Sequence, residues 1–308
     1  MSMKISGAPC CWGVDNPKNP YLPPWERVLK EASEAGYSGM ELGPYGYIPM
    51  ELEKVAGVLA ENKLNIIAGT IFDDLVSEEN FQNLIGQTHD ICGMVTKLPQ
   101  PPQEEGQRFK TPYLVVIDWG HDGRDYAAGH PDRAPRLNKE AWNRMMDHIR
   151  AIAKLAWETY GVRTVVHPHA GGYIEFADEI DQVAKDIPQE VAGLCLDTGH
   201  LYYSKMDPIE WLLKYKDRID YLHFKDIDRK VYDEVMNEKI RFFDACAKGV
   251  MCPIGKGVLP YEDIHRTLQE MGYAGYITVE QERDPRNVET SLRDVKASRD
   301  YLASVGFD

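Results

Sequence analysis

Histidine and carboxylate residues stand at the ends of short apolar runs in the second half of the chain. The run VRTVV ends in His167 and His169, and the run GLCL ends in Asp197, with His200 shortly after it. Imidazole and carboxylate groups are ligands that divalent manganese, iron, cobalt and zinc accept in mixed sets. These residue types in this position indicate a metal site or an acid–base site.

Two further apolar runs end in the same way. His223 and Asp226 close the stretch DYLHFKD, and Glu280 and Glu282 follow the run YITV. One such residue alone is usually structural, and Asp197 and Asp226 could each simply cap a following helix. Four successive occurrences are harder to explain separately, because a buried and unpaired carboxylate or imidazole is costly. Shared coordination of a metal ion would remove that cost.

The other histidines and the cysteines indicate no second site. The six cysteines show no repeated C-x-x-C pattern, so we expect reduced thiols. Cys10 and Cys11 are adjacent and could bind a soft metal or form a strained disulfide, but strand cysteines are more often small core residues. The histidines that we expect to be structural are His121, His130, His148 and His265.

The elements that must position these residues alternate between strand and helix. Strand-type runs occupy residues 4–13, 37–43, 64–72, 111–120, 162–170, 191–200, 220–226 and 274–282. Helical spacing occupies residues 25–36, 50–63, 77–98, 138–160, 176–187, 207–219, 230–247 and 261–272. This order predicts an α/β fold in which parallel strands close into a (β/α)₈ TIM barrel. An open doubly wound sheet is the alternative, but no G-x-G-x-x-G follows the first strand.

Two stretches interrupt this alternation without resembling domain linkers. Residues 98–112 carry prolines and charges, and we expect a surface excursion there. Residues 119–138 leave the C-terminal end of a predicted strand, where the loops of a barrel build its active site, so we expect them to cover or line a pocket. The sequence therefore predicts that residues 1–308 form a single (β/α)₈ barrel domain, with the four polar strand ends at one shared mouth.

The charge of the chain restricts its partners. The formal net charge is −14, from 35 basic and 49 acidic residues, and no Lys/Arg-rich run occurs. Such a chain would be repelled by nucleic acid and by anionic membranes. No stretch reaches the roughly 18 apolar residues that a membrane span needs, and the first residues lack the apolar core of a signal peptide. We expect a soluble, cytoplasmic protein.

Several stretches in combination resemble a known family. D-T-G-H, followed by H-F-K-D and then V-E-x-E, is similar to the xylose-isomerase-like sugar phosphate isomerase/epimerase superfamily, and most similar to its inosose dehydratase branch. The resemblance is dense from Tyr160 to Pro285 and lighter over residues 1–95. Its stretches are WGVDNP, VVHPHAGGYIE, LCLDTGHLYYS, YLHFKD, FFDACAKGVMCPIGKGVLPYEDI and GYAGYITVEQERDP.

The resemblance implies a divalent metal at the barrel mouth. Manganese or cobalt is common in the superfamily, with zinc, magnesium or iron as alternatives. Asp197, His223 and Glu280 match three of its ligands. The fourth ligand is usually a glutamate on strand five, and here His167 stands in its place, so that either His167 or His169 could bind the metal.

The resemblance also implies substrate contacts at the mouth. His200 matches a residue that contacts substrate or a second ion, and Glu41 falls where the superfamily carries a recurrent acid. We expect Asp226 and Lys256 to bind substrate as well. Lys225 could bind substrate oxygens, but we expect it to point out of the barrel.

The reactions of the superfamily begin with removal of a proton from the carbon next to a carbonyl group. Isomerases and epimerases often use two glutamates for this, and His167 breaks that pair. A histidine can instead protonate a departing hydroxyl group. We therefore expect a metal-dependent lyase, namely a dehydratase of a keto-cyclitol or keto-sugar. Glu280, Glu282 and His169 are the candidate bases, and the sequence does not rank them.

Three alternatives remain open at this stage. They are an isomerase or epimerase of a ketose, a lyase of 3-oxo-glycosides, and a non-catalytic sugar-binding barrel. The stretches VIDWGHDGRD and GPYGYIP depart from inosose dehydratases, so the substrate is less constrained than the reaction class. We expect a small-molecule keto-polyol or sugar as the partner, no nucleic acid, no membrane, and a homo-oligomer.

Overall fold

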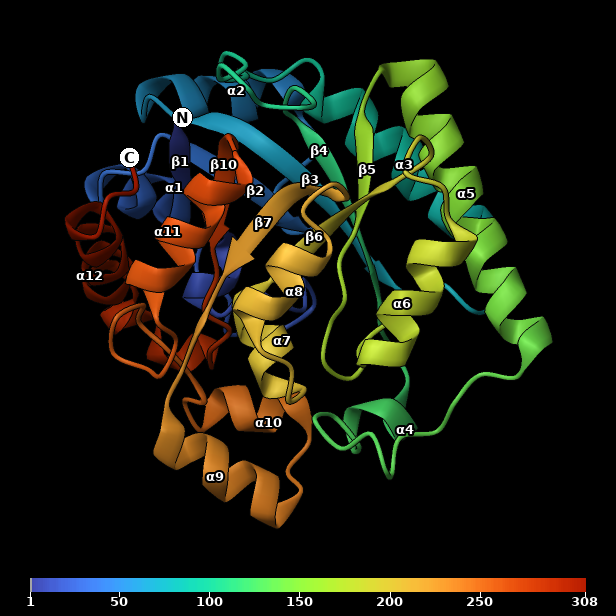
Figure 1. The fold of residues 1–308 in the computed structure, drawn as a ribbon. Coiled ribbons are helices and arrows are strands. Elements are labelled where there is room, and N and C mark those ends of the chain that lie inside the picture. The colour runs from blue at the N-terminus through green and yellow to red at the C-terminus, as the bar shows by residue number, and fades with distance from the viewer. Residues whose placement is uncertain (1) are drawn as a thin grey trace.

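The computed structural model describes residues 2–308, which contain a closed barrel of eight parallel strands. Each strand pairs with the next in the chain, and the last pairs with the first (Figure 1). The predicted (β/α)₈ barrel is confirmed. Its strands are β1 (Met3–Gly7), β2 (Gly39–Pro44), β3 (Asn65–Asp73), β4 (Tyr113–Asp118), β5 (Arg163–Val166), β6 (Gly193–Asp197), β7 (Ile219–Phe224) and β10 (Gly275–Val279).

Helices surround the barrel, and shorter ones follow the C-terminal ends of its strands. The outer helices are α1 (Trp25–Glu34), α2 (Leu52–Glu61), α3 (Phe81–Val95), α5 (Lys139–Tyr160), α6 (Ala177–Asp186), α8 (Pro208–Lys214), α11 (Tyr261–Met271) and α12 (Ser291–Ser304). The mouth carries α4 (Asp122–Asp125), α7 (Thr198–Tyr203), α9 (Arg229–Glu238), α10 (Phe242–Ala247) and the 3₁₀ turns η1 (Pro9–Trp12) and η2 (Pro285–Thr290).

Alternation along each strand decides which side chains fill the barrel. In β4, Tyr113, Val115 and Ile117 belong to the cluster inside the barrel, whereas Leu114 and Val116 pack under the helices. Successive side chains of a strand point to opposite faces, so residues two apart share a face. The same alternation continues past the last residue of each strand and aims polar side chains at the mouth.

Some element boundaries differ from those expected from the sequence. The first strand ends at Gly7, because Pro9 opens a 3₁₀ turn. The sixth strand ends at Asp197, whose carboxylate caps α7 by accepting a hydrogen bond from the His200 backbone N–H. The helix expected at residues 230–247 is two helices, and Lys239 between them has a φ of 57°. A small antiparallel pair, β8 (Asp226–Ile227) with β9 (Met251–Cys252), and helix α12 were not expected.

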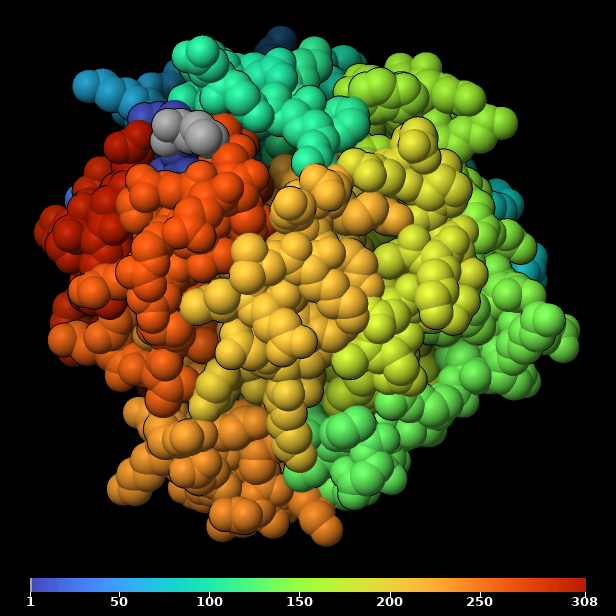
Figure 2. Space-filling model, viewed as in Figure 1, coloured from blue at the N-terminus to red at the C-terminus, as the bar shows by residue number. Residues whose placement is uncertain are grey.

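Helices α9 and α10 lie beyond the C-terminal ends of the strands, next to α4 (Figure 1). The two segments are adjacent on the surface (Figure 2). Arg241 forms an ion pair with Asp125, and the Phe242 backbone N–H donates to the same carboxylate at 2.9 Å. These contacts make a cap over the mouth, to which residues 119–138 contribute as expected.

Three further observations concern the whole chain. All six cysteines are buried free thiols, as expected, and this includes Cys10 and Cys11. Both chain ends lie on the same side, where the Asp308 backbone N–H donates to the Met3 carbonyl at 3.0 Å. Within residues 2–308, no helix has the length and apolar character needed to cross a membrane.

Candidate active site

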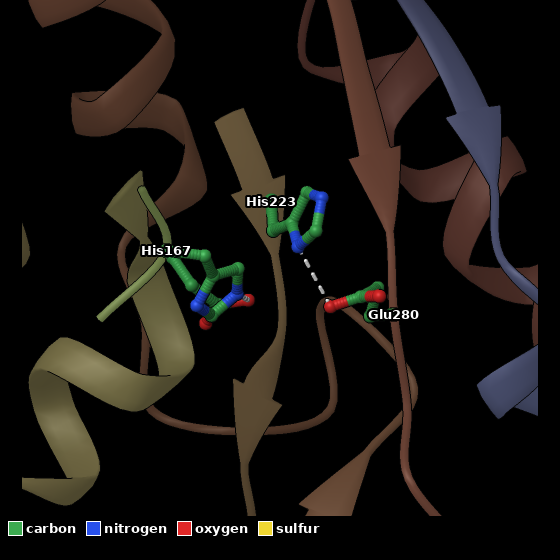
Figure 3. Close-up of side chains that lie close together, drawn as sticks. His167, His223 and Glu280 are labelled. Carbon is green, nitrogen blue, oxygen red and sulfur yellow. Dashed lines mark ion pairs between the residues drawn. The ribbon is translucent and has the colours of Figure 1, made fainter. Parts of the chain in front are cut away.

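Four of the expected ligand residues converge at the barrel mouth. One ligand atom from each of His167, Asp197, His223 and Glu280 lies within 4.8 Å of the others. The labelled His167, His223 and Glu280 project from the C-terminal ends of β5, β7 and β10 toward a common centre (Figure 3). The structure therefore brings together the residues that the sequence suggested as metal ligands.

The donor atoms of this cluster are suited to a cation. The His223 Nε2 lies 2.9 Å from Glu41 Oε1, and its Nδ1 lies 2.8 Å from Glu280 Oε2 (Figure 3). His167 Nδ1 and His167 Nε2 are buried and have no hydrogen-bond partner within residues 2–308. Buried polar atoms normally find a partner. Unpartnered imidazole nitrogens beside two carboxylates form a donor set that fits a divalent metal.

Lys225 also points into this cluster, contrary to our expectation. Its Nζ lies 2.8 Å from Asp197 Oδ2, 2.5 Å from Glu280 Oε2 and 3.0 Å from Glu282 Oε1. Its side chain is completely buried. The expectation was wrong because His223 and Lys225 are two residues apart, and alternation places such residues on the same face.

The positive charges keep the cluster carboxylates ionised. Burial alone would raise the pKa of Asp197, but Lys225 outweighs it and holds the pKa well below its usual range. Burial would also raise the pKa of Glu280, but His223 and Lys225 outweigh burial and hold this pKa well below its usual range. Carboxylates must be deprotonated to bind metal. Both side chains are thus in the form that ligation requires.

A second group of buried side chains lies beside the first. Ligand atoms of His169, His200 and Glu282 lie within 4.8 Å of one another. His169 Nδ1 lies 2.9 Å from the Ala170 carbonyl oxygen, so it donates a hydrogen bond to that oxygen. His200 Nδ1 instead accepts from the Ala170 backbone N–H at 3.1 Å. In the neutral rings, His169 Nε2 therefore carries a lone pair, whereas His200 Nε2 carries a hydrogen.

The charge state of these two histidines follows from their surroundings. Burial lowers the pKa of His169 well below its ordinary value, and the neighbouring His200 and His167 lower it further. Burial and the charge of Lys225 lower the pKa of His200 in the same direction. Both rings are neutral near pH 7, and a neutral histidine is a better base than acid. This disfavours His169 and His200 as proton donors to a departing hydroxyl group.

An inner cavity of about 50 Å³ lies between the two groups and the cap. It includes four residues singled out from the sequence, namely Glu41, His169, Glu280 and Glu282. Sequence reasoning missed Asp15, which also lines the cavity, because a single acid in a loop carries no periodic signal. The lining residues are Ala8, Cys10, Val14, Asp15, Glu41, Gly43, Pro44, Thr70, Phe72, Ile117, His169, Phe243, Glu280 and Glu282.

Glu41 is fixed in place by hydrogen bonds. It accepts a hydrogen bond from the Tyr221 hydroxyl at 2.7 Å and one from the Thr70 hydroxyl at 3.3 Å. It also lies 2.9 Å from His223 Nε2. A carboxylate that holds one imidazole nitrogen orients the other nitrogen toward a metal. Glu41 thus reaches the cavity, and its contacts assign it to orienting His223.

An outer groove of about 1070 Å³ extends from the inner cavity to the surface. Asp15, Pro44, Phe72 and Phe243 line both spaces. Trp119 stacks on Phe72 with ring centroids 5.2 Å apart and meets Phe243 edge-on at 4.9 Å. These three rings form the aromatic wall at the junction of the two spaces.

The arginines that line the outer groove are paired with aspartates. Arg241 lies 3.3 Å from Asp122 and also pairs with Asp125. Arg283 pairs with Asp294 at 3.1 Å, and Arg286 pairs with Asp284 at 2.5 Å. Lys18 also lines the groove and forms no ion pair within residues 2–308, and Arg283 Nε and Nη1 are buried there without a hydrogen-bond partner. The groove therefore still offers cationic groups to a ligand.

Asp226 and Lys256 are not part of the site. The Asp226 carboxylate accepts hydrogen bonds from the backbone N–H groups of Ile227, Gly255, Gly257 and Leu259, at 2.9 to 3.0 Å. It therefore organises a loop, where we had expected a substrate contact. Lys256 is exposed on that loop and lines neither the inner cavity nor the outer groove.

Comparisons with known proteins give relatives over nearly the whole chain. Residues 29–305 match the family described as "Xylose isomerase-like TIM barrel". An "Inosose dehydratase" of Geobacillus kaustophilus (strain HTA426) is 30% identical over 285 residues, which is 90% of this chain and 86% of the relative. An "Inosose dehydratase" of Clostridium botulinum (strain Alaska E43 / Type E3) is 27% identical over 305 residues, which is 97% of this chain and 96% of the relative.

A solved structure supports the fold. The crystal structure of "IOLI protein with a binding zinc atom" superposes with a TM-score of 0.70. It covers 98% of both chains at 14% sequence identity. At this identity the likeness establishes the barrel fold alone.

Proposed function

The chain belongs to the xylose isomerase-like TIM barrel family, and on that premise we propose that it is a divalent-metal-dependent lyase of keto-cyclitols or keto-sugars. The observation that carries this proposal is the convergence of His167 with Asp197, His223 and Glu280 in one buried cluster. The curated relatives are named for the dehydration of an inosose, which is a keto-cyclitol. We infer the same reaction class here.

The cluster of these four residues is proposed to hold the metal ion. Both nitrogens of the buried His167 ring lack a hydrogen-bond partner within residues 2–308, and the Asp197 and Glu280 carboxylates are ionised. Manganese or cobalt is our first expectation, and the solved structural neighbour carries zinc. When bound, such an ion acts as a Lewis acid that stabilises negative charge on a carbonyl oxygen.

His169 is proposed to be the base. It lines the inner cavity, and its Nδ1–H is bound to the Ala170 carbonyl, so the Nε2 lone pair is free. Glu280 and Glu282 line the same cavity but are ion-paired with Lys225. A free lone pair takes a proton more readily than a carboxylate held by an ammonium group. We therefore assign to His169 the removal of the proton next to the substrate carbonyl.

The inner cavity supports an uncharged substrate. The carboxyl groups of Asp15, Glu41, Glu280 and Glu282 line it, and no lysine or arginine within residues 2–308 does. A sugar phosphate would place its anion against these acidic groups. A neutral keto-polyol fits this arrangement better, and this favours the lyase over a sugar phosphate isomerase.

The first test is incubation of metal-reconstituted protein with 2-keto-myo-inositol. We expect the ultraviolet absorbance of a conjugated dione and a loss of water by mass, both abolished by a chelator. Asp197→Asn and Glu280→Gln should lose stoichiometric metal and turnover while keeping the circular dichroism of the parent. Hydrogen exchange in deuterated water without loss of water from any keto-polyol would instead assign an isomerase or epimerase.

A further inference from the structure

Loss of a hydroxyl group requires an acid as well as a base, because hydroxide departs slowly unless it is protonated. The inner cavity contains six titratable side chains, namely Cys10, Asp15, Glu41, His169, Glu280 and Glu282. His169 is assigned above as the base. The acid must be sought among the other five.

Three of the carboxylates are already engaged. Glu41 accepts hydrogen bonds from Tyr221 and Thr70 and contacts His223. Glu280 contacts His223 and Lys225, and Glu282 pairs with Lys225. Carboxylates that hold cations or accept such bonds act as acceptors and not as proton donors.

The cysteine is too weak an acid for this role. Burial raises the pKa of Cys10 well above that of an ordinary thiol, and Cys11 raises it further. Its proton is therefore held too tightly to be transferred readily to a departing oxygen.

Asp15 differs from the other carboxyl groups of the cavity. Within residues 2–308 it has no ion pair and no hydrogen-bond partner. It follows the η1 turn and lines both the inner cavity and the outer groove. Its oxygens are free to contact a substrate in the cavity and can exchange protons with solvent through the groove.

We propose that Asp15 is the acid that protonates the departing oxygen, and this assignment rests on the proposed lyase function. The base removes the proton from the carbon between the carbonyl carbon and the carbon that bears the leaving hydroxyl. The electron pair of that C–H bond becomes the new C=C bond, and the C–O bond breaks. The oxygen leaves with the Asp15 proton as water, and solvent then reprotonates Asp15.

The electrostatic surroundings of Asp15 suit this role. Burial raises the pKa of Asp15 well above its usual range, and the negative charges of Glu282 and Glu280 raise it further. Lys225 acts in the opposite direction, and Cys11 adds a smaller increase. The two glutamates face Asp15 from the segment after β10, Lys225 from the residue after β7, and Cys11 from η1. A carboxyl group held protonated near neutral pH can serve as a general acid.

The test uses two substrates that differ in their leaving group. One is 2-keto-myo-inositol, and the other is its analogue with fluorine in place of the departing hydroxyl. Fluoride departs without receiving a proton, so its release, followed with a fluoride electrode, should not need Asp15. Asp15→Asn should lower kcat for the hydroxyl substrate by about 10²- to 10⁴-fold with little change in KM. Fluoride release should stay within about 3-fold of the parent, well inside the effect of a lost acid.

Two companion variants support the interpretation. Asp15→Glu keeps an acid in the cavity and should recover part of the lost kcat. Asp233→Asn makes the same chemical change on the exposed face of α9, outside both spaces, and should leave both rates unchanged. A thermal melt of Asp15→Asn that matches the parent shows that the fold is retained.

Several outcomes would overturn the assignment. A raised KM with unchanged kcat would make Asp15 a binding residue, and an equal loss with both substrates would exclude an acid role. In either case the parent still eliminates, so the proposed function survives. If the parent eliminates neither water nor fluoride from any keto-polyol, the proposed function fails and the Asp15 assignment fails with it.

Discussion

Lys225 balances the charge at the centre of the molecule. Its completely buried ammonium group contacts Asp197, Glu280 and Glu282 at 2.5 to 3.0 Å. Burial alone would lower its pKa, but these three carboxylates outweigh burial and raise the pKa well above its usual value. Three carboxylates so close together would otherwise repel one another. The stability of the barrel mouth therefore depends on this cation.

Replacing Lys225 should lower the unfolding free energy of the metal-free protein. Lys225→Met removes the cation and leaves the carboxylates buried without it, so the metal-free protein should lose about 3 kcal/mol of unfolding free energy. Urea unfolding in the presence of a chelator measures this loss. Lys214→Met is the matched control, because Lys214 forms a half-exposed pair with Asp181, and such pairs contribute at most about 1 kcal/mol. Equal effects of the two variants would contradict the charge-balance role.

His169 and His200 should make the metal-free protein sensitive to mild acid. Their pKa values are lowered in the fold, so below the ordinary value of 6.5 the unfolded chain binds more protons than the folded one. Stability is therefore intact above pH 6.5 and falls as the pH drops below it, by at most about 1.4 kcal/mol per pH unit for each histidine. Burial also raises the pKa of Glu175 to about 7, which gives an opposite slope over part of this range.

The histidine contribution is isolated by comparing variants. Urea unfolding at pH 7.5 and at pH 5.5 should show a smaller loss of stability for the double variant His169→Gln/His200→Gln than for the parent. The Glu175 contribution is common to both proteins and cancels in the difference. Parallel pH profiles would show that the two histidines do not titrate on unfolding as inferred.

At the scale of elements, the sequence predicted those features that depend on the regular spacing of apolar and polar residues. The order of strands and helices follows from the spacing of apolar residues, and the polar strand ends follow from parallel closure. Alternation also predicts the inward direction of Lys225, because it stands two residues after the inward-pointing His223. Asp15 could not be found in this way, because it lies in an irregular segment after η1 whose path depends on long-range packing. The two-helix form of residues 230–247 was missed because Lys239 gives no turn signal of the glycine or proline kind.

Asp226 shows how one side chain can define an irregular element. Its carboxylate accepts hydrogen bonds from backbone N–H groups of residues 227, 255, 257 and 259, and a Cβ on Gly257 would lie only 2.2 Å from its Oδ1. The loop therefore wraps closely around this carboxylate. Its burial is explained by these bonds without any role in catalysis.

Removing this carboxylate should loosen the loop. Asp226→Ala leaves four backbone donors without their acceptor, and each such loss costs about 1 to 3 kcal/mol when it is buried. We expect a destabilisation of at least about 3 kcal/mol and faster hydrogen exchange at the amides of residues 255, 257 and 259. Asp228→Ala removes only the N-cap of α9 and should cost about 1 kcal/mol. A similar cost for both variants would show that the loop is held by other contacts.

At the scale of the whole molecule, the cap lies over the candidate active site. The barrel places the acidic and imidazole groups at one end, and α9, α10 and residues 119–138 close over that end (Figure 1). A molecule or ion that moves between the inner cavity and the outer groove must pass the aromatic wall of Phe72, Trp119 and Phe243. A proposed metal ion would leave and return by the same route. We therefore expect the wall to limit the exchange of a bound metal as well as the entry of a substrate.

Phe243 is the member of this wall that the cap contributes. It is half-buried, lines both spaces, and has its ring 4.9 Å from Trp119 and 6.4 Å from Phe72. Phe243→Ala should widen the junction between the two spaces without disturbing the metal ligands. A chelator should then remove the metal about tenfold faster. This rate increase corresponds to a decrease of about 1.4 kcal/mol in the activation barrier. Tyr126→Ala removes an exposed ring that lines neither space, and it should leave the rate of metal loss unchanged. If Phe243→Ala also leaves that rate unchanged, metal reaches the cluster by another path and the cap is not the gate.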